Sequence, residues 1–252
     1  RSRGLGDVYK RQGVGRLPEP EAIVDWLEAK MCSTNELEGT TILVTAGGTQ
    51  ESIDPVRYIG NRSSGKMGYA IAEQAAHMGA KVILVSAPTS LPIPSGVDFI
   101  SVDSAVSMQE AVEARYNDVN VVIMAAAVSD FRVLHKAEQK IKKMESMTIE
   151  LVKNPDILQG LGSKKSHQIL VGFAAETEHV IKYGQDKVAK KNLDMLVAND
   201  VSKSNAGFNV DTNEGYFLYP DKEPKEMPNM KKSDLARHIL REVIDLVANK
   251  HS

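Results

Sequence analysis

Short apolar runs rich in β-branched residues alternate with segments of helical periodicity through most of the chain. The runs 41–46, 81–86 and 119–128 predict strands, and residues 66–78 and 104–116 predict helices between them. Apart from Asn120, the last of these runs is apolar throughout, which is typical of a central strand buried on both faces. Strands that alternate with helices predict an α/β fold, in which a mostly parallel sheet carries helices on both faces.

The second half of the chain continues this alternation less regularly. Further strands are predicted at 98–102, 148–152, 168–173, 193–198 and 216–219, and further helices at 179–191 and from Ser233 onward. Asn154, Pro155 and Asp156 are interpreted as the N-cap, the first-turn proline and the first-turn acid of a short helix. Residues 211–215 are interpreted as a turn that leads into the strand after it.

The chain divides into three parts. Residues 1–12 show no apolar periodicity, so they are interpreted as a vector or sequencing scar or as a flexible tail, outside the fold in either case. Residues 13–38 contain a helix candidate at 20–31, followed by a polar linker that begins at Ser33. Residues 39–252 carry the alternating strands and helices and form the predicted functional domain.

Composition and charge exclude several classes of protein. Of the 252 residues, 42% are apolar and 25% are charged, as in ordinary globular domains. The net charge of −2 gives no sign of a nucleic-acid partner. The longest apolar run, 121–128, is far shorter than the ~20 residues that a membrane helix needs, so no membrane partner is expected. Cys32 is the only cysteine, which favours a reducing, cytoplasmic location.

The loop between the first strand and the first helix holds the densest candidate chemistry. Its sequence, residues 47–68, is GGTQESIDPVRYIGNRSSGKMG, whereas strand-to-helix connections usually take about 2–6 residues. It follows a parallel strand, at the edge where open α/β sheets bind ligands. Ser63, Ser64 and Gly65 directly precede a helix, so their hydroxyl and N–H groups, together with Gly48, could cradle a phosphate. The alternative is a purely structural loop with a serine cap.

Two nucleotide-binding motifs fit this region poorly. Residues 60–66 (GNRSSGK) match the spacing of a P-loop, but Met67 stands where that motif needs Ser or Thr for magnesium, and the preceding strand ends some 14 residues too early. Gly47 and Gly48 lack the G-x-G-x-x-G spacing of dinucleotide-binding proteins, and the second strand ends at 86–88 without an acid for the ribose.

A second candidate follows the apolar run 119–128. The sequence of residues 125–132 is AAAVSDFR, whose small side chains would let a ligand approach the backbone closely. Asp130 would then face the crevice, available to a metal ion or a nucleotide. The alternative, an aspartate that only stabilises a turn or caps a helix, is open on these local grounds.

Two lysine sets complete the candidates. In an extended chain, Lys140 and Lys142 lie on one side while Ile141 turns inward. Lys187 and Lys191 are i,i+4 neighbours on a predicted helix. Both sets converging on one crevice would suit a polyphosphate, whereas the alternative for each is a solvated surface.

Together these segments resemble the phosphopantothenate–cysteine ligase family (phosphopantothenoylcysteine synthetase), whose fold is Rossmann-like. The resemblance covers residue 39 to the C-terminus and rests on GGTQESIDPVRYIGNRSSGKMG, AAAVSDFR, KIKK, KNPDIL, GFAAET and KKNLDMLVAND, in that order. Residues 13–24 (GVGRLPEPEAIV) resemble the end of the flavin-dependent decarboxylase half of the bifunctional bacterial protein. The resemblance implies fusion of the native chain to that decarboxylase, whose own motifs are not found here, so FMN is not expected on this fragment.

The resemblance implies a two-step ligase reaction of coenzyme A biosynthesis. The carboxylate of 4′-phosphopantothenate attacks the α-phosphate of CTP, which releases pyrophosphate and leaves an acyl-cytidylate. The amine of L-cysteine then attacks the acyl group and expels CMP. Because a carboxylate and a triphosphate repel each other, lysines and Mg²⁺ must offset the repulsion, each charged hydrogen bond contributing about 1.5–3 kcal/mol. The family is dimeric, so a homodimer is expected, in which residues 202–219 help to build the partner's site.

The resemblance also assigns roles to residues. Lys140 acts in forming the cytidylate, Asn61 hydrogen-bonds the activated intermediate in the second step, and Asp130 is the candidate Mg²⁺ ligand. The CTP-binding positions are Met124, Ala125, Ala126, Asp130, Lys140, Pro155, Asp156, Ile157, Leu158, Phe173, Lys187 and Lys191. Two rival hypotheses are an NAD(P)-linked oxidoreductase, disfavoured by the missing ribose acid, and a catalytically silent regulator, disfavoured by the presence of Asn61 and Lys140.

Overall fold

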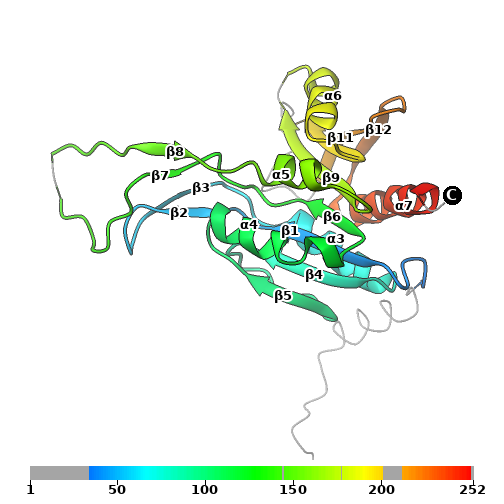
Figure 1. Ribbon diagram of the computed structural model, residues 1–252, viewed down its shortest axis with the longest axis horizontal. Helices are drawn as coiled ribbons and strands as arrows, with labels where there is room; N and C mark the ends of the chain where they lie inside the picture. Colours follow the sequence, from blue (N-terminus) through cyan, green and yellow to red (C-terminus); the bar gives the residue numbers. More distant parts are fainter. Residues whose placement is uncertain (1–33, 144, 177, 201–211, 251–252) are drawn as a thin grey trace, which may run out of the picture.

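Figure 1 shows the computed structural model, which describes residues 34–143, 145–176, 178–200 and 212–250. The strands are β1 (Thr41–Ala46), β2 (Gln50–Ser52), β3 (Tyr58–Gly60), β4 (Lys81–Ser86), β5 (Val97–Ser101), β6 (Val121–Met124), β7 (Phe131–Val133), β8 (Leu151–Lys153), β9 (Ile169–Glu176), β10 (Met195–Asp200), β11 (Thr212–Leu218) and β12 (Lys225–Lys231). The helices are α3 (Lys66–His77), α4 (Ala105–Glu113), α5 (Ile157–Lys164), α6 (Val180–Lys190) and α7 (Lys232–Lys250), with a 3-10 turn at Tyr116–Asp118. The tail 1–12 and the predicted helix 20–31 lie outside the described residues.

Within the described part of the chain, eight strands form one sheet in the order β12-β11-β10-β9-β6-β1-β4-β5. The strands from β10 to β5 run parallel, and β11 and β12 extend the sheet as antiparallel strands. The chain builds outward from β1 to β4 and β5, then returns to β6 and builds the other way. The order therefore reverses between β1 and β6, and in open α/β sheets such a reversal opens a crevice at the carboxyl ends of the two strands.

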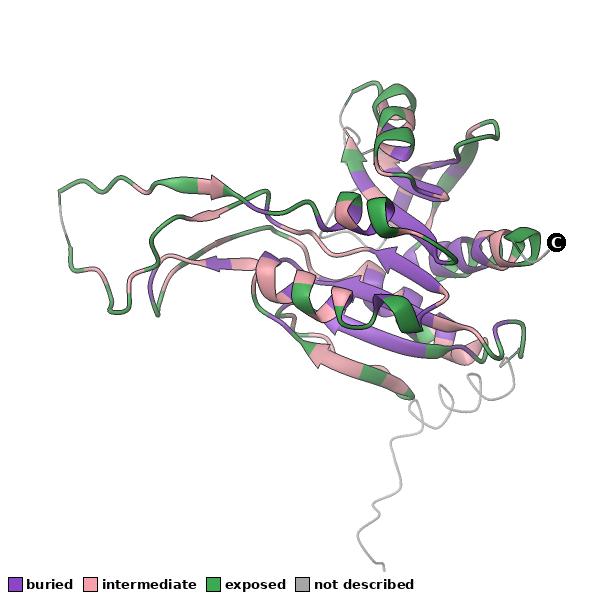
Figure 2. Cartoon of the chain, in the orientation of Figure 1, coloured by how far each residue is buried: buried purple, intermediate pink, exposed green. Residues whose placement is uncertain are grey.

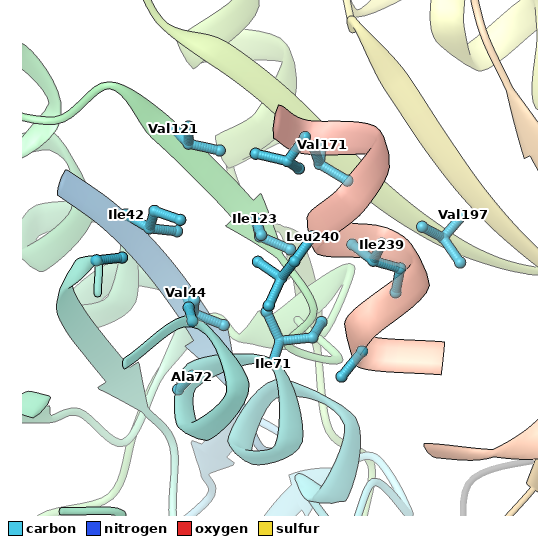
Figure 3. Packing of buried hydrophobic residues seen from close by; sticks show 14 of the residues in the cluster. Ile42, Val44, Ile71, Ala72, Val121, Ile123, Val171, Val197, Ile239 and Leu240 are labelled. Carbon is cyan, nitrogen blue, oxygen red and sulfur yellow. The ribbon is translucent and has the colours of Figure 1, made fainter. Parts of the chain in front are cut away.

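Helices cover both faces of this sheet, as predicted. Alternate side chains along each strand point to opposite faces, so Ile42 and Val44 of β1 belong to one buried cluster and Leu43 to the other. Helices α3 and α7 pack on the first face, where Figure 3 shows Ile71 and Leu240 close to the strand residues. Helices α4, α5 and α6 contribute buried residues to the second face. Figure 2 shows the central strands buried along most of their length. The predicted α/β fold is confirmed.

The apolar run 119–128 forms a shorter strand than predicted. Only Val121–Met124 pairs in the sheet, between β1 and β9, and all four residues are buried as expected of a central strand. Beyond it, the N–H of Ala126 turns to the side-chain hydroxyl of Thr45, at 3.1 Å. Ala127 exchanges backbone hydrogen bonds with residues 47–49 instead of continuing the ladder to β9. The apolar character of these alanines therefore reflects a close approach between two loops and not a longer strand.

The predicted N-cap of α5, Asn154, was wrong. The helix begins at Ile157, and its N-cap is Asp156, whose carboxylate accepts a hydrogen bond from Gln159 N at 3.0 Å. Asn154 instead is buried and donates from Nδ2 to the carbonyl of Ser129, at 2.8 Å. The side chain of Asn154 therefore holds the segment after β6 and does not cap the helix.

Other predicted elements also differ from those in the structure. The described part of the predicted turn 211–215 belongs to β11, and β12 was missed because its sequence, KEMPNMK, is mostly polar with a central proline. The predicted strand 148–152 becomes β8, which pairs with β7 outside the main sheet. The helix predicted at 104–116 is α4, closed at its start by a capping box of Ser104 and Ser107 and followed by the 3-10 turn.

Two thin hairpins project beyond the carboxyl edge of the sheet (Figure 1). They consist of residues 50–60 with β2 and β3, and of residues 131–143 and 145–153 with β7 and β8; we call them the arm. Strand β2 lies beside β7 within the arm.

None of the helices that the structure describes is both long and apolar enough to cross a bilayer.

Candidate nucleotide and substrate site

Two adjoining clefts open at the carboxyl edge of β1, β6 and β9, where the strand order reverses. The first has a volume of about 370 Å³ and the second about 280 Å³, and both are lined by Ala126, Asp130 and Phe173. The first cleft also holds the predicted residues Asn61, Ser63, Ser64, Gly65, Ala125 and Lys187. The second also holds Met124, Pro155, Asp156, Ile157, Leu158 and Lys191. All predicted site residues except Gly48 and Lys140 therefore gather here, although their roles stay predictions.

The long loop after β1 packs its start against the segment after β6. Gly47 has a φ of +81°, and a Cβ there would lie 2.7 Å from the carbonyl oxygen of Ala87, so only glycine fits. Gly48 forms a parallel bridge with Ala127, which lines the first cleft. Asn61 donates from Nδ2 to the carbonyl of Ala127, at 2.9 Å, which fixes the orientation of its amide. The loop thus carries Asn61 to the first cleft as a positioned side chain.

Helix α3 begins at the wall of the first cleft. Its N-cap is Gly65, in the left-handed conformation with a φ of +78°, and no side chain caps the helix. The hydroxyl of Ser63 accepts from Gly65 N at 3.3 Å, before the helix begins. The serine cap of the structural alternative is therefore not formed. The positive end of a helix dipole and the first-turn N–H groups suit an anion at this wall.

Asp130 is held by a network in the segment that follows β6. The N–H of Ser129 donates to the hydroxyl of Thr49 at 2.9 Å, and the N–H of Asn154 donates to the carbonyl of Asp130 at 2.8 Å. The Asp130 side chain is exposed and lines both clefts. Among the described residues, no three His, Cys, Asp or Glu side chains form a metal-binding group. One carboxylate fits Mg²⁺ only where substrate phosphates complete the coordination, which is the usual mode of this ion.

Lys187 of α6 lines the first cleft, and Lys191, the C-cap residue of this helix, lines the second. Lys187 Nζ donates to Glu176 Oε1 at 2.5 Å, and Lys191 Nζ lies 2.8 Å from Asp156 Oδ2. Burial opposes ionisation of Asp156, but hydrogen bonds from Lys191 and from a backbone N–H outweigh it and lower the pKa of this carboxyl. Both cations thus stand beside carboxylates at the cleft walls, and a bound polyphosphate would compete for them.

Lys140 and Lys142 line neither cleft. They lie on the arm, exposed, with Ile141 half-buried between them, so the predicted alternation is correct. Within a single chain, the two lysine sets therefore do not line the same cleft. The reason is that the backbone of Ile141 is hydrogen-bonded to Asp54 and Arg57 at the tip of the other hairpin.

The family model described as the C-terminal domain of the DNA/pantothenate metabolism flavoprotein matches residues 37–247. The chain belongs to this family. The match spans every residue of the two clefts, and it confirms the resemblance found from the motifs.

Curated relatives and a solved structure agree with this assignment. The coenzyme A biosynthesis bifunctional protein CoaBC of Bacillus subtilis (strain 168) is 48% identical over 238 residues, which is 93% of this chain and 59% of that protein. The protein of the same name from Escherichia coli (strain K12) is 44% identical over 248 residues, 96% of this chain and 60% of that protein. A crystal structure of the C-terminal domain of a CoaBC protein is 44% identical and has a TM-score of 0.75, covering 86% of this chain and all of that domain. The chain thus spans about 60% of the length of these curated relatives.

The sequence reasoning missed several residues of the first cleft. Lys66, Met67, Asn199, Asn213 and Lys232 also line it. Asn199 lies at the carboxyl end of β10, so the rule that found Asp130 would have found it too. Asn213 was assigned to a turn, whereas in β11 its Nδ2 lies 3.4 Å from Asn199 Oδ1.

Proposed function

We propose that this domain joins 4′-phosphopantothenate to L-cysteine, using CTP and passing through an acyl-cytidylate. The observation that carries the proposal is the pair of adjoining clefts at the strand reversal, which bring together Asn61, Asp130 and the α6 lysines. The same domain in relatives 44–48% identical belongs to proteins named for coenzyme A biosynthesis.

The second cleft, with Asp156, Leu158 and Lys191, is assigned to CTP, and the first cleft is assigned to 4′-phosphopantothenate. Ala125 and Lys187, which line the first cleft, stay assigned to CTP, so the two substrates share that cleft. The N-terminus of α3 in the first cleft suits the terminal phosphate of the pantothenate. The carboxylate and the α-phosphate would then meet where the clefts join, beside the small side chain of Ala126, which permits close approach.

The chemistry at this junction has two steps. A carboxylate oxygen attacks the α-phosphorus, the bond to the β-phosphate breaks, and pyrophosphate leaves with the electron pair. The amine nitrogen of cysteine then attacks the acyl carbon and loses a proton, and the acyl–oxygen bond breaks to release CMP. Cations beside the phosphates lower the first barrier because they offset the charge that accumulates there. Asp130, with the phosphates, would hold the Mg²⁺ that adds to this charge compensation.

Asn61 suits the second step. Because its Nδ2 is committed to the carbonyl of Ala127, its Oδ1 is left in a fixed direction to accept a hydrogen bond. A neutral amide cannot offset the charge of a phosphate, but it can orient an incoming amine. Replacement by aspartate would put a carboxylate beside that carbonyl and beside the negatively charged intermediate.

The position of Lys140 leads us to propose a homodimer with composite sites. Six large apolar side chains of the arm are exposed: Val56, Tyr58, Phe131, Leu134, Met147 and Leu151. An exposed apolar surface of this kind is typical of a protein interface. If the arm packs on a second copy, Lys140 reaches the cleft of the partner, which it does not reach in its own chain.

Two variants test the division of the reaction. Lys140→Ala should abolish pyrophosphate release even without cysteine, because the first step loses a cation. Asn61→Asp should still release pyrophosphate and accumulate the acyl-cytidylate, detected by mass spectrometry after cysteine is added. If Asn61→Asp folds and binds CTP but forms no cytidylate, the assignment of Asn61 to the second step is wrong.

Mixing these variants tests the composite site. In a mixed dimer, the cleft of the Lys140→Ala chain keeps Asn61 and receives Lys140 from its partner. Random exchange makes half of the dimers mixed, each with one intact site, so about a quarter of wild-type activity should return after co-expression. If the sites lie within single chains, no site contains both residues, so product forms only from acyl-cytidylate that dissociates from an Asn61→Asp chain and binds to a Lys140→Ala chain.

A further inference from the structure

A buried carboxylate joins the two hairpins of the arm. Asp54 lies in the turn between β2 and β3, and its side chain is 0% exposed, although the turn itself lies at the surface. The hydrogen-bond partners of the Asp54 side chain are Val56, Arg57 and Ile141, and none of them lines either cleft. A buried charge is costly unless hydrogen bonds satisfy it, so the partners of this carboxylate indicate what it does.

The two oxygens of Asp54 have different partners. Oδ1 accepts from the N–H groups of Val56 and Arg57, both at 2.8 Å, and so shapes its own turn. Oδ2 accepts from Arg57 Nε at 3.0 Å and Nη2 at 2.6 Å, and from the N–H of Ile141 at 3.1 Å. The guanidinium of Arg57 holds the pKa of this carboxyl well below its ordinary range, so Asp54 is charged at neutral pH.

These bonds fix the segment that carries Lys140. Arg57 Nη2 donates to the carbonyl of Ile141 at 3.3 Å, so both backbone polar groups of Ile141 are bound by the opposite hairpin. Three residues earlier than Lys140, the N–H of Ala137 donates to the carbonyl of Ile53 at 2.9 Å. Lys140 thus lies between two anchor points while its own side chain stays exposed.

We propose that Asp54 is a positioning residue for Lys140: it fixes the backbone next to this lysine and so sets where the ammonium group stands during cytidylate formation. The proposal rests on the proposed function, in which Lys140 acts in the first step only. It gives the arm a second role besides contact with a partner, because a lysine on an unanchored loop would reach the reacting phosphate only part of the time.

The chain offers a matched control in the same hairpin. Glu51 is also a buried carboxylate, with 3% of the residue exposed, but it accepts from the N–H of Ala105 at the start of α4, at 2.9 Å. Glu51→Gln therefore replaces a buried carboxyl group of β2 by an amide without touching the segment around Lys140. Asp54→Asn removes the charge that holds Arg57 and puts an amide group where one oxygen accepted hydrogen bonds.

The experiment measures each half-reaction separately. Pyrophosphate release from CTP and 4′-phosphopantothenate without cysteine reports the first step, and CMP release from supplied acyl-cytidylate with cysteine reports the second. We expect Asp54→Asn to lower the first rate by about ten- to a hundredfold, the size typical of a misplaced catalytic group. The second rate and the CTP dissociation constant should stay within about threefold of wild type, and Glu51→Gln should leave both rates within about the same range.

The outcomes separate this inference from the proposed function. A wild-type protein that releases no pyrophosphate overturns both together. If wild type is active and Lys140→Ala is not, but Asp54→Asn matches Glu51→Gln or lowers both half-reactions equally, the inference alone is overturned. If Asp54→Asn does not fold, Ile141→Pro decides, because it removes the N–H that donates to Asp54 Oδ2 and should give the same selective loss. An unchanged first rate there overturns the inference.

Discussion

Replacing Asn154 by alanine should destabilise the fold through one buried network. Asn154 is 5% exposed; its Nδ2 donates to the carbonyl of Ser129 at 2.8 Å, and its Oδ1 accepts from Arg132 Nη1 at 3.1 Å. Ser129 is itself buried, so Asn154→Ala leaves a buried carbonyl without its donor. An unsatisfied buried group of this kind costs about 1–3 kcal/mol in the free energy of unfolding.

Urea unfolding followed by circular dichroism measures this loss. The midpoint should fall while the slope with denaturant stays constant, and the melting temperature should drop by roughly 2–4 °C for each kcal/mol. Asn117→Ala, at an exposed position, is the control and should change the free energy of unfolding by less than about 0.5 kcal/mol. Asn154→Asp keeps an acceptor for Arg132 but loses the donor to Ser129, so it should be destabilised too. An alanine variant as stable as wild type would refute the reasoning.

Two further predictions concern a glycine at the cleft and the acid stability of the arm. Gly65→Ala should lower the free energy of unfolding more than Gly96→Ala. Both glycines have a φ of +78°, a conformation that costs alanine about 1–2 kcal/mol. A Cβ at Gly65 would also lie 2.6 Å from Thr89 Cγ2, whereas nothing lies within 4 Å of a Cβ at Gly96. Equal losses in thermal unfolding would contradict this steric contribution. Because Arg57 lowers the pKa of Asp54 in the folded state, the stability from this ionisation is present above the unfolded pKa of about 3.9 and is lost as pH falls below it. Wild type should therefore lose more stability than Asp54→Asn between about pH 4 and 2 in acid titrations of unfolding, and parallel curves would show that the charge is not coupled to folding.

Elements set by local burial could be predicted from the sequence. Strands β1 and β4 end where their apolar runs end, and Gly79, with a φ of +88°, stops α3 where the helical pattern predicts. The run 119–128 was overextended because alanines packed between two loops have the same hydrophobic character as residues of a buried strand. Strand β12 was missed because its edge position leaves mostly polar side chains and a proline in the sequence.

The candidate site shows the same division. Asp130 was expected at the carboxyl edge of the sheet because it follows a predicted parallel strand. Lys187 and Lys191 were assigned to the site by the family resemblance alone. The place of Lys140 depends on a hydrogen bond from Ile141 to Asp54, 87 residues away in the sequence, and no local pattern encodes such a contact. The sequence around Asn154 is that of a helix N-cap. Only the folded structure shows that its side chain instead donates a hydrogen bond to the carbonyl of Ser129, which is 25 residues away in the sequence.

The most direct test of the central claim is a single-turnover assay of the wild-type domain with Mg²⁺ but without cysteine. The account predicts about one equivalent of pyrophosphate per active site, only when CTP and 4′-phosphopantothenate are both present, and CMP release only after cysteine is added. Pyrophosphate release that needs cysteine, or that proceeds without 4′-phosphopantothenate, would contradict the proposed order of steps, and the absence of any release from folded, CTP-binding protein would contradict the proposed function itself.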